Sequence, residues 1–248
     1  MKLGAQLFTV RDFTQNLDDF AETLKKVAQI GYKSVQVSAT CAYEPHWLDS
    51  QLKKNGLVCA VTHTNAERLR NETDKVVAEH KVFGCSYIGI GVAPNLNTFS
   101  EDFIGTAKRM KEQGAKFMFH NHSYEFVHVE GSKKVILEKM AEDFAKDELS
   151  FILDTYWIQA AGADPAQWIK KLAGRVECVH LKDMIYAGNR QTKMAPIYEG
   201  LMNFDSIIDA CAASGTEYLL VEQDDCYGED PFECLAKSYN NLKAKGLS

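Results

Sequence analysis

Several features that identify whole classes of protein are missing from this 248-residue sequence. It has no basic excess, because 28 Lys and Arg stand against 34 Asp and Glu, so it lacks the positive field that attracts nucleic acid or anionic membranes. It also has no long hydrophobic run. Arg11 and Asp12 interrupt the first apolar stretch, which fits neither a signal peptide nor a membrane span. We expect a cytoplasmic protein that binds neither nucleic acid nor membranes.

Paired cysteines and glycine-rich nucleotide motifs are absent as well. The seven cysteines are odd in number and form no CxxC pair, which favours reduced thiols over a disulfide framework. No GxGxxG or GxxxxGK[ST] motif follows the first apolar segment, which disfavours a nucleotide-binding doubly wound sheet. No linker, low-complexity tract or charge run divides the chain. We therefore expect a single domain over residues 1–248.

The sequence does contain a regular alternation of short β-rich segments and amphipathic stretches. Apolar residues between Leu17 and Ile30 recur at spacings of three and four, as on one face of a helix. Strict alternation in a chain of about 250 residues predicts an α/β fold, a single (β/α)8 TIM barrel. The longest irregular segment, residues 184–203, is expected to serve the active site as a lid or wall. The eight predicted strands are residues 2–8, 34–38, 58–63, 87–92, 116–122, 150–154, 177–181 and 217–222.

Four of the predicted strands end in side chains that commonly bind metals. The fifth ends in His120 and His122, the sixth in Asp154, the seventh in His180 and the eighth in Glu222. The carboxyl ends of barrel strands meet at one mouth, so we expect these side chains to cluster there. Histidines with carboxylates suit one divalent ion, Mn, Zn, Mg, Fe or Co, better than Ca²⁺. The spacing leaves open whether His120 or His122 is the ligand.

Other polar residues at strand ends are candidates for catalysis and substrate binding. Residues two apart in a strand share a face, which pairs His180 with Lys182. We expect Glu222 to be a catalytic base as well as a ligand, with Lys182 and His122 as proton-transfer groups. His80 and His128 are expected on the solvated surface. The candidate substrate contacts are His63, Gln6, Gln36 and Trp157.

An ordered set of motifs extends over the chain, namely GAQLFTVR, FHNHSYEF, LDTYW, VHLKD, IYEGLMNFDSI and LLVEQD. With these motifs the chain resembles the xylose-isomerase-like TIM barrels, specifically sugar phosphate isomerases/epimerases and inosose dehydratases. The resemblance implies a metal held by Glu, Asp, His and Glu on successive strands. By position the last three are Asp154, His180 and Glu222, whereas His120 stands where many relatives have Glu. The resemblance also implies a site role for Glu199, which lies in a segment similar to the family's Gly-Glu-Gly.

The leading functional hypothesis is a metal-dependent isomerase or epimerase that removes a proton next to the carbonyl of a small sugar or keto-sugar. The alternative on the same metal site is a lyase, either inosose dehydratase-like or a β-eliminating enzyme of 3-keto-glycosides. Replacement of the first glutamate by His120 favours that alternative, because elimination needs only one base and a general acid. An endonuclease-like phosphodiesterase and a non-catalytic carbohydrate-binding barrel are weaker hypotheses. A homo-oligomer is left open.

Overall fold

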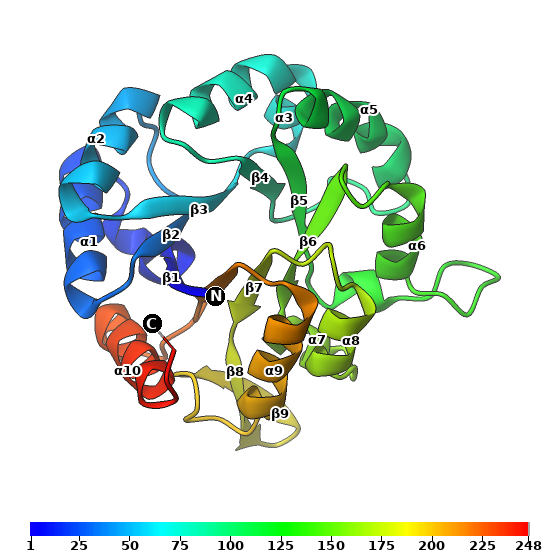
Figure 1. The fold of residues 1–248 in the computed structure, drawn as a ribbon. Helices are drawn as coiled ribbons and strands as arrows, with labels where there is room; N and C mark the ends of the chain where they lie inside the picture. The colour runs from blue at the N-terminus through cyan, green and yellow to red at the C-terminus, as the bar shows by residue number, and fades with distance from the viewer. Residues whose placement is uncertain (248) are drawn as a thin grey trace.

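Eight parallel strands form a closed barrel in the protein's structure, a computed structural model that describes residues 1–247 (Figure 1). Around the barrel the strand order is β1-β10-β7-β6-β5-β4-β3-β2. Each barrel strand therefore pairs with the barrel strands that precede and follow it along the chain, and the last pairs with the first. The (β/α)8 fold predicted from the sequence is confirmed. The barrel strands are β1 (Lys2–Gln6), β2 (Ser34–Val37), β3 (Val58–His63), β4 (Tyr87–Ile90), β5 (Lys116–His120), β6 (Leu149–Asp154), β7 (Cys178–Leu181) and β10 (Tyr218–Val221).

The helices pack around the outside of the barrel, and polar caps fix where several of them begin. The side chain of Asn16 accepts a hydrogen bond from the Asp19 amide at the start of the first helix, and Asp164 and Asp230 cap helices that start with proline. The helices are α1 (Leu17–Ile30), α2 (Pro45–Asn55), α3 (Ala66–Asn71), α4 (Thr73–Val82), α5 (Phe99–Glu112), α6 (Ile136–Asp143), α7 (Thr155–Ala160), α8 (Pro165–Lys171), α9 (Phe204–Ser214) and α10 (Pro231–Ala244), with 3₁₀ turns at Leu7–Phe13 and Tyr124–Phe126.

Two groups of apolar side chains fill the molecule. The larger lies between strands and helices and includes Phe20, Phe103 and Leu235, all fully buried. The smaller group is a separate cluster on the strands. Most of its residues alternate along the strands with residues that pack outward against the helices, so the cluster lies inside the barrel. Its members are Ala60, Val61, Met118, Ile152, Cys178 and Leu220. The interior of the barrel is therefore a packed core.

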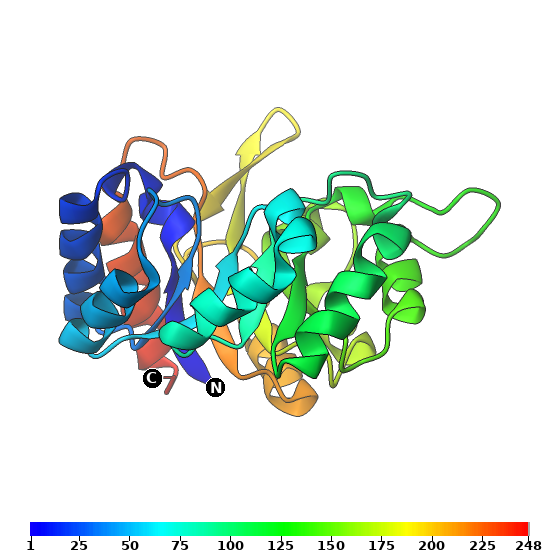
Figure 2. The same ribbon diagram turned by 90° about the horizontal axis from the view of Figure 1, so that it is seen from above.

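The first part of the segment predicted to be irregular, residues 184–203, forms a hairpin instead, and residues 196–203 are a loop. Strands β8 (Asp183–Gly188) and β9 (Gln191–Ala195) pair antiparallel and project from the side of the barrel opposite the two termini (Figure 2). The buried Asp183 carboxylate anchors the base, because it accepts hydrogen bonds from the amides of Met184, Tyr198 and Gly200. A Cβ at Gly200 would clash with Asp183, so glycine is required at this position.

All seven cysteines are free thiols, as the sequence predicted. Their positions range from fully buried, as at Cys178, to partly exposed, as at Cys41. Among residues 1–247, none of the helices has both the length and the apolar character needed to cross a membrane.

The expectation that His80 is solvated was wrong, because its side chain is only 4% exposed. Its Nδ1–H donates to the carbonyl of Val76 (2.7 Å), and its Nε2 accepts from the hydroxyl of Thr62 (2.8 Å). Both bonds are satisfied by the neutral ring, and burial lowers the pKa of His80 to about 4. His128, by contrast, is exposed as expected.

We predict that His80 makes the fold sensitive to acid. The unfolded chain takes up a proton near pH 6.5 and the folded one only near pH 4, so stability is lost as the pH falls between these values. A shift of this size corresponds to about 3 kcal/mol. The free energy of unfolding should therefore fall less steeply with acid for His80→Gln than for the wild type. Urea titrations at pH 7, 6, 5 and 4 give the free energy of unfolding at each pH. If this free energy falls with pH equally in both proteins, the prediction is wrong. His128→Gln is the matched surface control.

Candidate metal centre

Strand register brings the four predicted ligands together inside the mouth of the barrel. Each of His120, Asp154, His180 and Glu222 lies two residues after a member of the inner apolar cluster, which are Met118, Ile152, Cys178 and Leu220. Residues two apart share a face, so the ligands form the next layer of inward-pointing side chains. One potential ligand atom from each residue lies within 4.8 Å of the others, and all four residues are buried.

Asp154 is held in place by the end of its own strand. It is the last residue of β6 and also the N-cap of α7, where its Oδ1 accepts a hydrogen bond from the amide of Trp157 (3.0 Å). Its own amide donates to Oδ1 of Asn121 on the neighbouring strand's exit (3.0 Å). One carboxylate oxygen therefore has a structural role, and Oδ2 remains directed at the cluster.

His180 is oriented by Gln36 from the far side of the barrel. Its Nε2 lies 2.6 Å from the side-chain oxygen of Gln36, which can only accept, so Nε2 carries the proton. In the neutral ring Nδ1 is then a bare lone pair, 2.8 Å from Oε2 of Glu222. A histidine whose outer nitrogen is bound in this way is typical of a metal ligand.

The distances in this cluster fit ligands that share one small cation. Nε2 of His120 lies 3.3 Å from Oδ2 of Asp154, and Nδ1 of His180 lies 3.6 Å from the same oxygen. Donor atoms about 2.0–2.2 Å from a common ion would be about 3–4 Å apart. Within residues 1–247, Nδ1 of His180 and Oε2 of Glu222 are buried without a hydrogen-bond partner. The residues present therefore fit a divalent metal.

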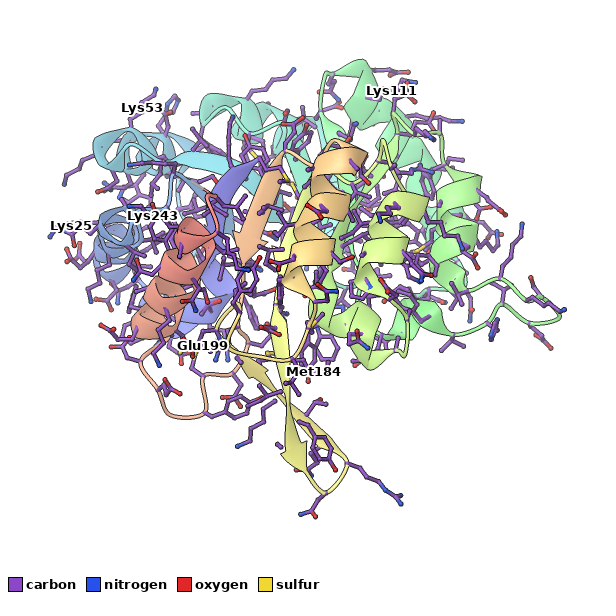
Figure 3. All side chains as sticks on the ribbon, turned by 60° about the horizontal axis from the view of Figure 1, so that its bottom comes forward. Lys25, Lys53, Lys111, Met184, Glu199 and Lys243 are labelled. Atoms are coloured by element: carbon purple, nitrogen blue, oxygen red, sulfur yellow. The ribbon has the colours of Figure 1, made fainter. Side chains whose placement is uncertain are left out.

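Lys182 supplies a positive charge to this cluster. Most lysines lie on the outer faces of the helices, as Lys25, Lys53 and Lys111 do (Figure 3), whereas Lys182 is 1% exposed. Its ammonium lies 2.9 Å from Oδ2 of Asp154, 3.0 Å from Oε2 of Glu222 and 2.9 Å from Oδ1 of Asp224. Lys182 therefore contacts the same two oxygens that face the histidines.

The electrostatics of the site follow from two buried carboxylates. Burial alone would raise the pKa of Glu222, but the charges of Lys182 and His180 lower it overall, and Lys182 does the same for Asp154. For His180, burial opposes protonation, yet the charge of Glu222 raises its pKa to about 9. Burial and the charge of Glu222 raise the pKa of Asp224 to about 7. Asp154 and Glu222 therefore stay ionised, whereas Asp224 is partly protonated near neutral pH.

A cavity of about 250 Å³ opens over the cluster. The predicted catalytic residues Glu222, Lys182 and His122 line it, and so do the predicted contacts Gln6 and His63. Gln6 also donates to Oε1 of Glu222 (3.1 Å), which fixes the carboxylate. Phe8, which the sequence suggested as an apolar wall, lines the cavity as well. The sequence analysis assigned no role to Ser38 or Asp224, although the same-face spacing of Asp224 and Glu222 was a usable signal.

Three other predicted contacts are placed differently. Gln36 is fully buried behind His180 and positions that ring. The indole of Trp157 packs beside His122 and Lys182, with its centre 5.7 Å from the ammonium, and does not line the cavity. Glu199 is exposed on the loop that returns from the hairpin (Figure 3), where it contacts Asn241 of α10, and the structure does not bring it to the cluster.

The two histidines of the fifth strand have different surroundings. His120 is 4% exposed and contacts Asp154, whereas His122 lies beyond the strand end, between His120 and Trp157. Burial lowers the pKa of His122 to about 4, so the ring is neutral at physiological pH. Glu125 is buried and accepts the His122 amide (2.7 Å). Its carboxylate is therefore occupied by the backbone rather than directed at the cluster.

Comparison with known proteins identifies the relatives of this fold. The family model described as a xylose isomerase-like TIM barrel matches residues 24–239. No curated protein matches the chain. Among solved structures, a sugar phosphate isomerase/epimerase from Parabacteroides distasonis ATCC 8503 has a TM-score of 0.81 at 23% identity, over 98% of this chain and 94% of that one.

Two further solved structures carry different activities on the same fold. An L-ribulose 3-epimerase has a TM-score of 0.74 at 16% identity, over 99% of this chain and 94% of its own. A probable 3-DHS dehydratase from Bacillus anthracis, involved in petrobactin synthesis, has a TM-score of 0.74 at 14% identity, over 98% and 99% of the two chains. At such low identities the likeness establishes the fold alone.

We predict that the charge of Lys182 stabilises the metal-free site and lowers its affinity for a metal ion. In chelator-treated protein, Lys182→Met should lower the free energy of unfolding by about 3–5 kcal/mol, because Asp154 and Glu222 lose their cationic partner. Its affinity for Mn²⁺, measured by calorimetry, should rise about tenfold or more, since an ammonium beside the ligands repels the ion.

The matched control for this prediction is Lys116→Met. Lys116 pairs with Glu177 at 2.6 Å, at the beginning of β5 and away from the cluster. This variant should leave Mn²⁺ affinity unchanged. If Lys182→Met binds Mn²⁺ no more tightly than the wild type, the two cations do not oppose each other and the prediction is wrong.

Proposed function

Because the chain belongs to the xylose isomerase-like TIM barrel family, we propose that it is a metal-dependent enzyme that removes a proton next to the carbonyl of a small sugar or keto-sugar. The observation that carries this proposal is the joint presence of Glu222 in the ligand cluster and in the wall of the 250 Å³ cavity. A carboxylate so placed can be a ligand and also face a substrate. The free thiols support a reducing compartment such as the cytoplasm.

The proposed ligands are His120, Asp154, His180 and Glu222, for one ion of Mn, Zn, Mg, Fe or Co. When bound, such an ion polarises a carbonyl and stabilises the negative charge that develops when the neighbouring carbon loses its proton. His120 is the better ligand candidate of its strand, because its Nε2 faces Asp154 whereas His122 lies nearer the outside.

The chain's own residues supply the proton transfers in this proposal. Glu222 takes the proton from the carbon, and the side-chain amide of Gln6 holds this carboxylate in place through Oε1. Lys182, which lines the cavity and bonds Asp224, donates to the substrate oxygen or to a leaving group. The neutral ring of His122 offers a further hydrogen bond from the cavity wall.

One observation favours a single-base reaction over epimerisation. An epimerase that exchanges a proton between two carboxylates needs them on opposite faces of the substrate carbon. His120 provides no carboxylate, and Glu125 is bound to the backbone of His122. We therefore favour isomerisation first, with β-elimination from a keto-sugar or keto-glycoside as the second candidate, since each requires one base and one proton donor.

The decisive experiment follows hydrogen exchange in D₂O by NMR. Metal-loaded protein is incubated with ketoses, aldoses, keto-inositols and 3-keto-glycosides. Deuterium at a carbon next to the carbonyl, in a substrate that loses no group, indicates isomerisation or epimerisation. Loss of water or of an aglycone indicates elimination. If no candidate exchanges, the proposed function fails.

We predict that Glu222→Gln lowers the exchange rate about 10²–10⁴-fold, because the amide cannot accept the proton. Since Glu222 is also a proposed ligand, metal content is measured by elemental analysis and rates are compared at full loading. Glu217→Gln is the matched control, because Glu217 bonds Tyr87 just before the same strand, at the other end of the barrel. Wild-type exchange in fully loaded Glu222→Gln would remove Glu222 as the base.

A further inference from the structure

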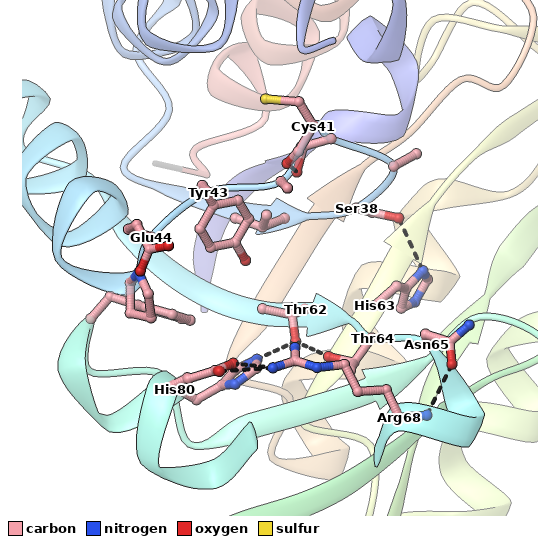
Figure 4. Close-up of a pocket in the computed structure, with 17 residues that line it drawn as sticks. Ser38, Cys41, Tyr43, Glu44, Thr62, His63, Thr64, Asn65, Arg68 and His80 are labelled. Carbon is pink, nitrogen blue, oxygen red and sulfur yellow. Dashed lines mark hydrogen bonds and ion pairs between the residues drawn. The ribbon is translucent and has the colours of Figure 1, made fainter. Parts of the chain in front are cut away.

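A second cavity, of about 570 Å³, lies next to the one over the metal centre (Figure 4). It is enclosed by three segments: the loop after β2, the end of β3 with the loop after it, and α3 with α4. Tyr43 and Cys41 lie on one side and Thr62, Arg68 and His80 on the other. Pockets for organic ligands typically measure roughly 300–1,000 Å³, so this cavity is large enough for a sugar-sized group.

The two cavities meet at a narrow boundary. Ser38, Ala39 and His63 line both of them, and the Ser38 hydroxyl lies 3.3 Å from Nδ1 of His63. The His63 ring also packs 5.2 Å from that of His120 and 5.9 Å from that of His180. A molecule that contacts the metal centre could therefore extend past His63 into the larger cavity.

His63 has hydrogen-bonding capacity that the described residues 1–247 leave unused. Its Nε2 is buried and has no partner there, while Nδ1 is occupied by Ser38. A buried ring nitrogen normally has a partner, and its lack of one costs free energy. A hydroxyl of a molecule bound between the two cavities would provide that partner.

The charge of the larger cavity disfavours phosphate. Its cation, Arg68, is bound by both carboxylate oxygens of Glu79, at 2.6 and 2.8 Å. Arginine recognises phosphate through a planar fork of nitrogens, and here Nη2 is bound by Glu79 and Nε lies 3.7 Å from a carboxylate oxygen of Glu72, so the charge of Arg68 is already balanced. Glu44 adds a second negative charge to the lining, and His80 is neutral at physiological pH. An anionic group would therefore be repelled.

The remaining lining suits neutral hydroxyl groups. Thr62 and Thr64 bring hydroxyls 3.3 Å apart, and the carboxylate of Glu79 can accept hydrogen bonds from a ligand. Phe83 and Tyr43 pack edge to face and provide an apolar wall. Hydroxyl acceptors and donors beside an aromatic wall match a sugar ring, which has polar edges and an apolar face.

We propose that the larger cavity is a second subsite, which takes a neutral glycosyl group attached to the sugar that reacts at the metal centre. The enzyme's substrate class is then a keto-disaccharide or keto-glycoside rather than a free or phosphorylated monosaccharide. This inference rests on the proposed function, because it assigns the reacting end of the substrate to the smaller cavity.

The test compares substrates that share one reacting ketose. D-Fructose, fructose 6-phosphate and the glycosyl-fructoses turanose, maltulose, palatinose and lactulose are assayed with Mn²⁺-loaded protein, by calorimetry for binding and by NMR in D₂O for exchange. At least one glycosyl-fructose should bind about tenfold or more tightly than fructose. Equal binding of all of them, or preference for the phosphate, overturns the proposal.

A variant that fills the larger cavity locates the effect. Thr64 lines that cavity and not the smaller one, so Thr64→Trp should abolish the preference for the glycosyl-fructose over fructose. Ser50→Trp, on the exposed side of α2, is the matched control and should keep the preference. A preference that survives in Thr64→Trp places the glycosyl group elsewhere and overturns the proposal.

A second readout separates this proposal from the proposed function. Methyl α-D-glucoside and methyl β-D-galactoside, which have no carbonyl, are titrated into the protein, and backbone amide signals are followed by NMR. Shifts confined to residues 37–45, 62–68 and 79–83 support the subsite even if no ketose exchanges, in which case only the proposed function fails. No shift with either glycoside and no glycosyl preference overturn the subsite.

Discussion

The structure of the site depends on two carboxylates that are buried at the mouth of the barrel and require positive charge. Asp154 and Glu222 are 0% and 3% exposed, and a buried carboxylate without a cationic partner is strongly destabilising. The chain supplies Lys182 and can protonate His180 to balance them. Two buried, ionised carboxylates that require positive charge also suit a divalent ion.

The barrel concentrates these charges at one end of its packed interior. Each ligand extends a strand whose previous inward residue is apolar, so the layer below is a packed core that excludes water from one side of the cluster. Hydrogen bonds from Gln6 and Gln36 then orient Glu222 and His180. The positions of the four side chains are therefore fixed by strand register, and the orientations of Glu222 and His180 by residues on the first two strands.

The sequence predicted the barrel and the clustering of His120, Asp154, His180 and Glu222, because both depend on local periodicity. The C-terminal ends of β3 and β6 agree with prediction, whereas β1 ends at Gln6 and a 3₁₀ turn follows. The hairpin β8–β9 was missed, since much of it is exposed and shows no apolar alternation. The pairing of His180 with Gln36 joins residues 144 apart, and such contacts cannot be deduced from local pattern. The burial of His80 was missed for the same reason.

Histidine at position 120 changes the charge of the centre as well as its set of bases. With an ion bound and both histidines neutral, the charges of the ion and Lys182 would about balance those of Asp154, Glu222 and Asp224, the last of which has a pKa of about 7 and is only partly ionised at neutral pH. A glutamate in place of His120 would leave the centre negative. A neutral centre repels a developing substrate anion less than a negative one does. Under the proposed function, His120 would leave a single carboxylate base and would lower the cost of forming that anion, a step that isomerisation and elimination share.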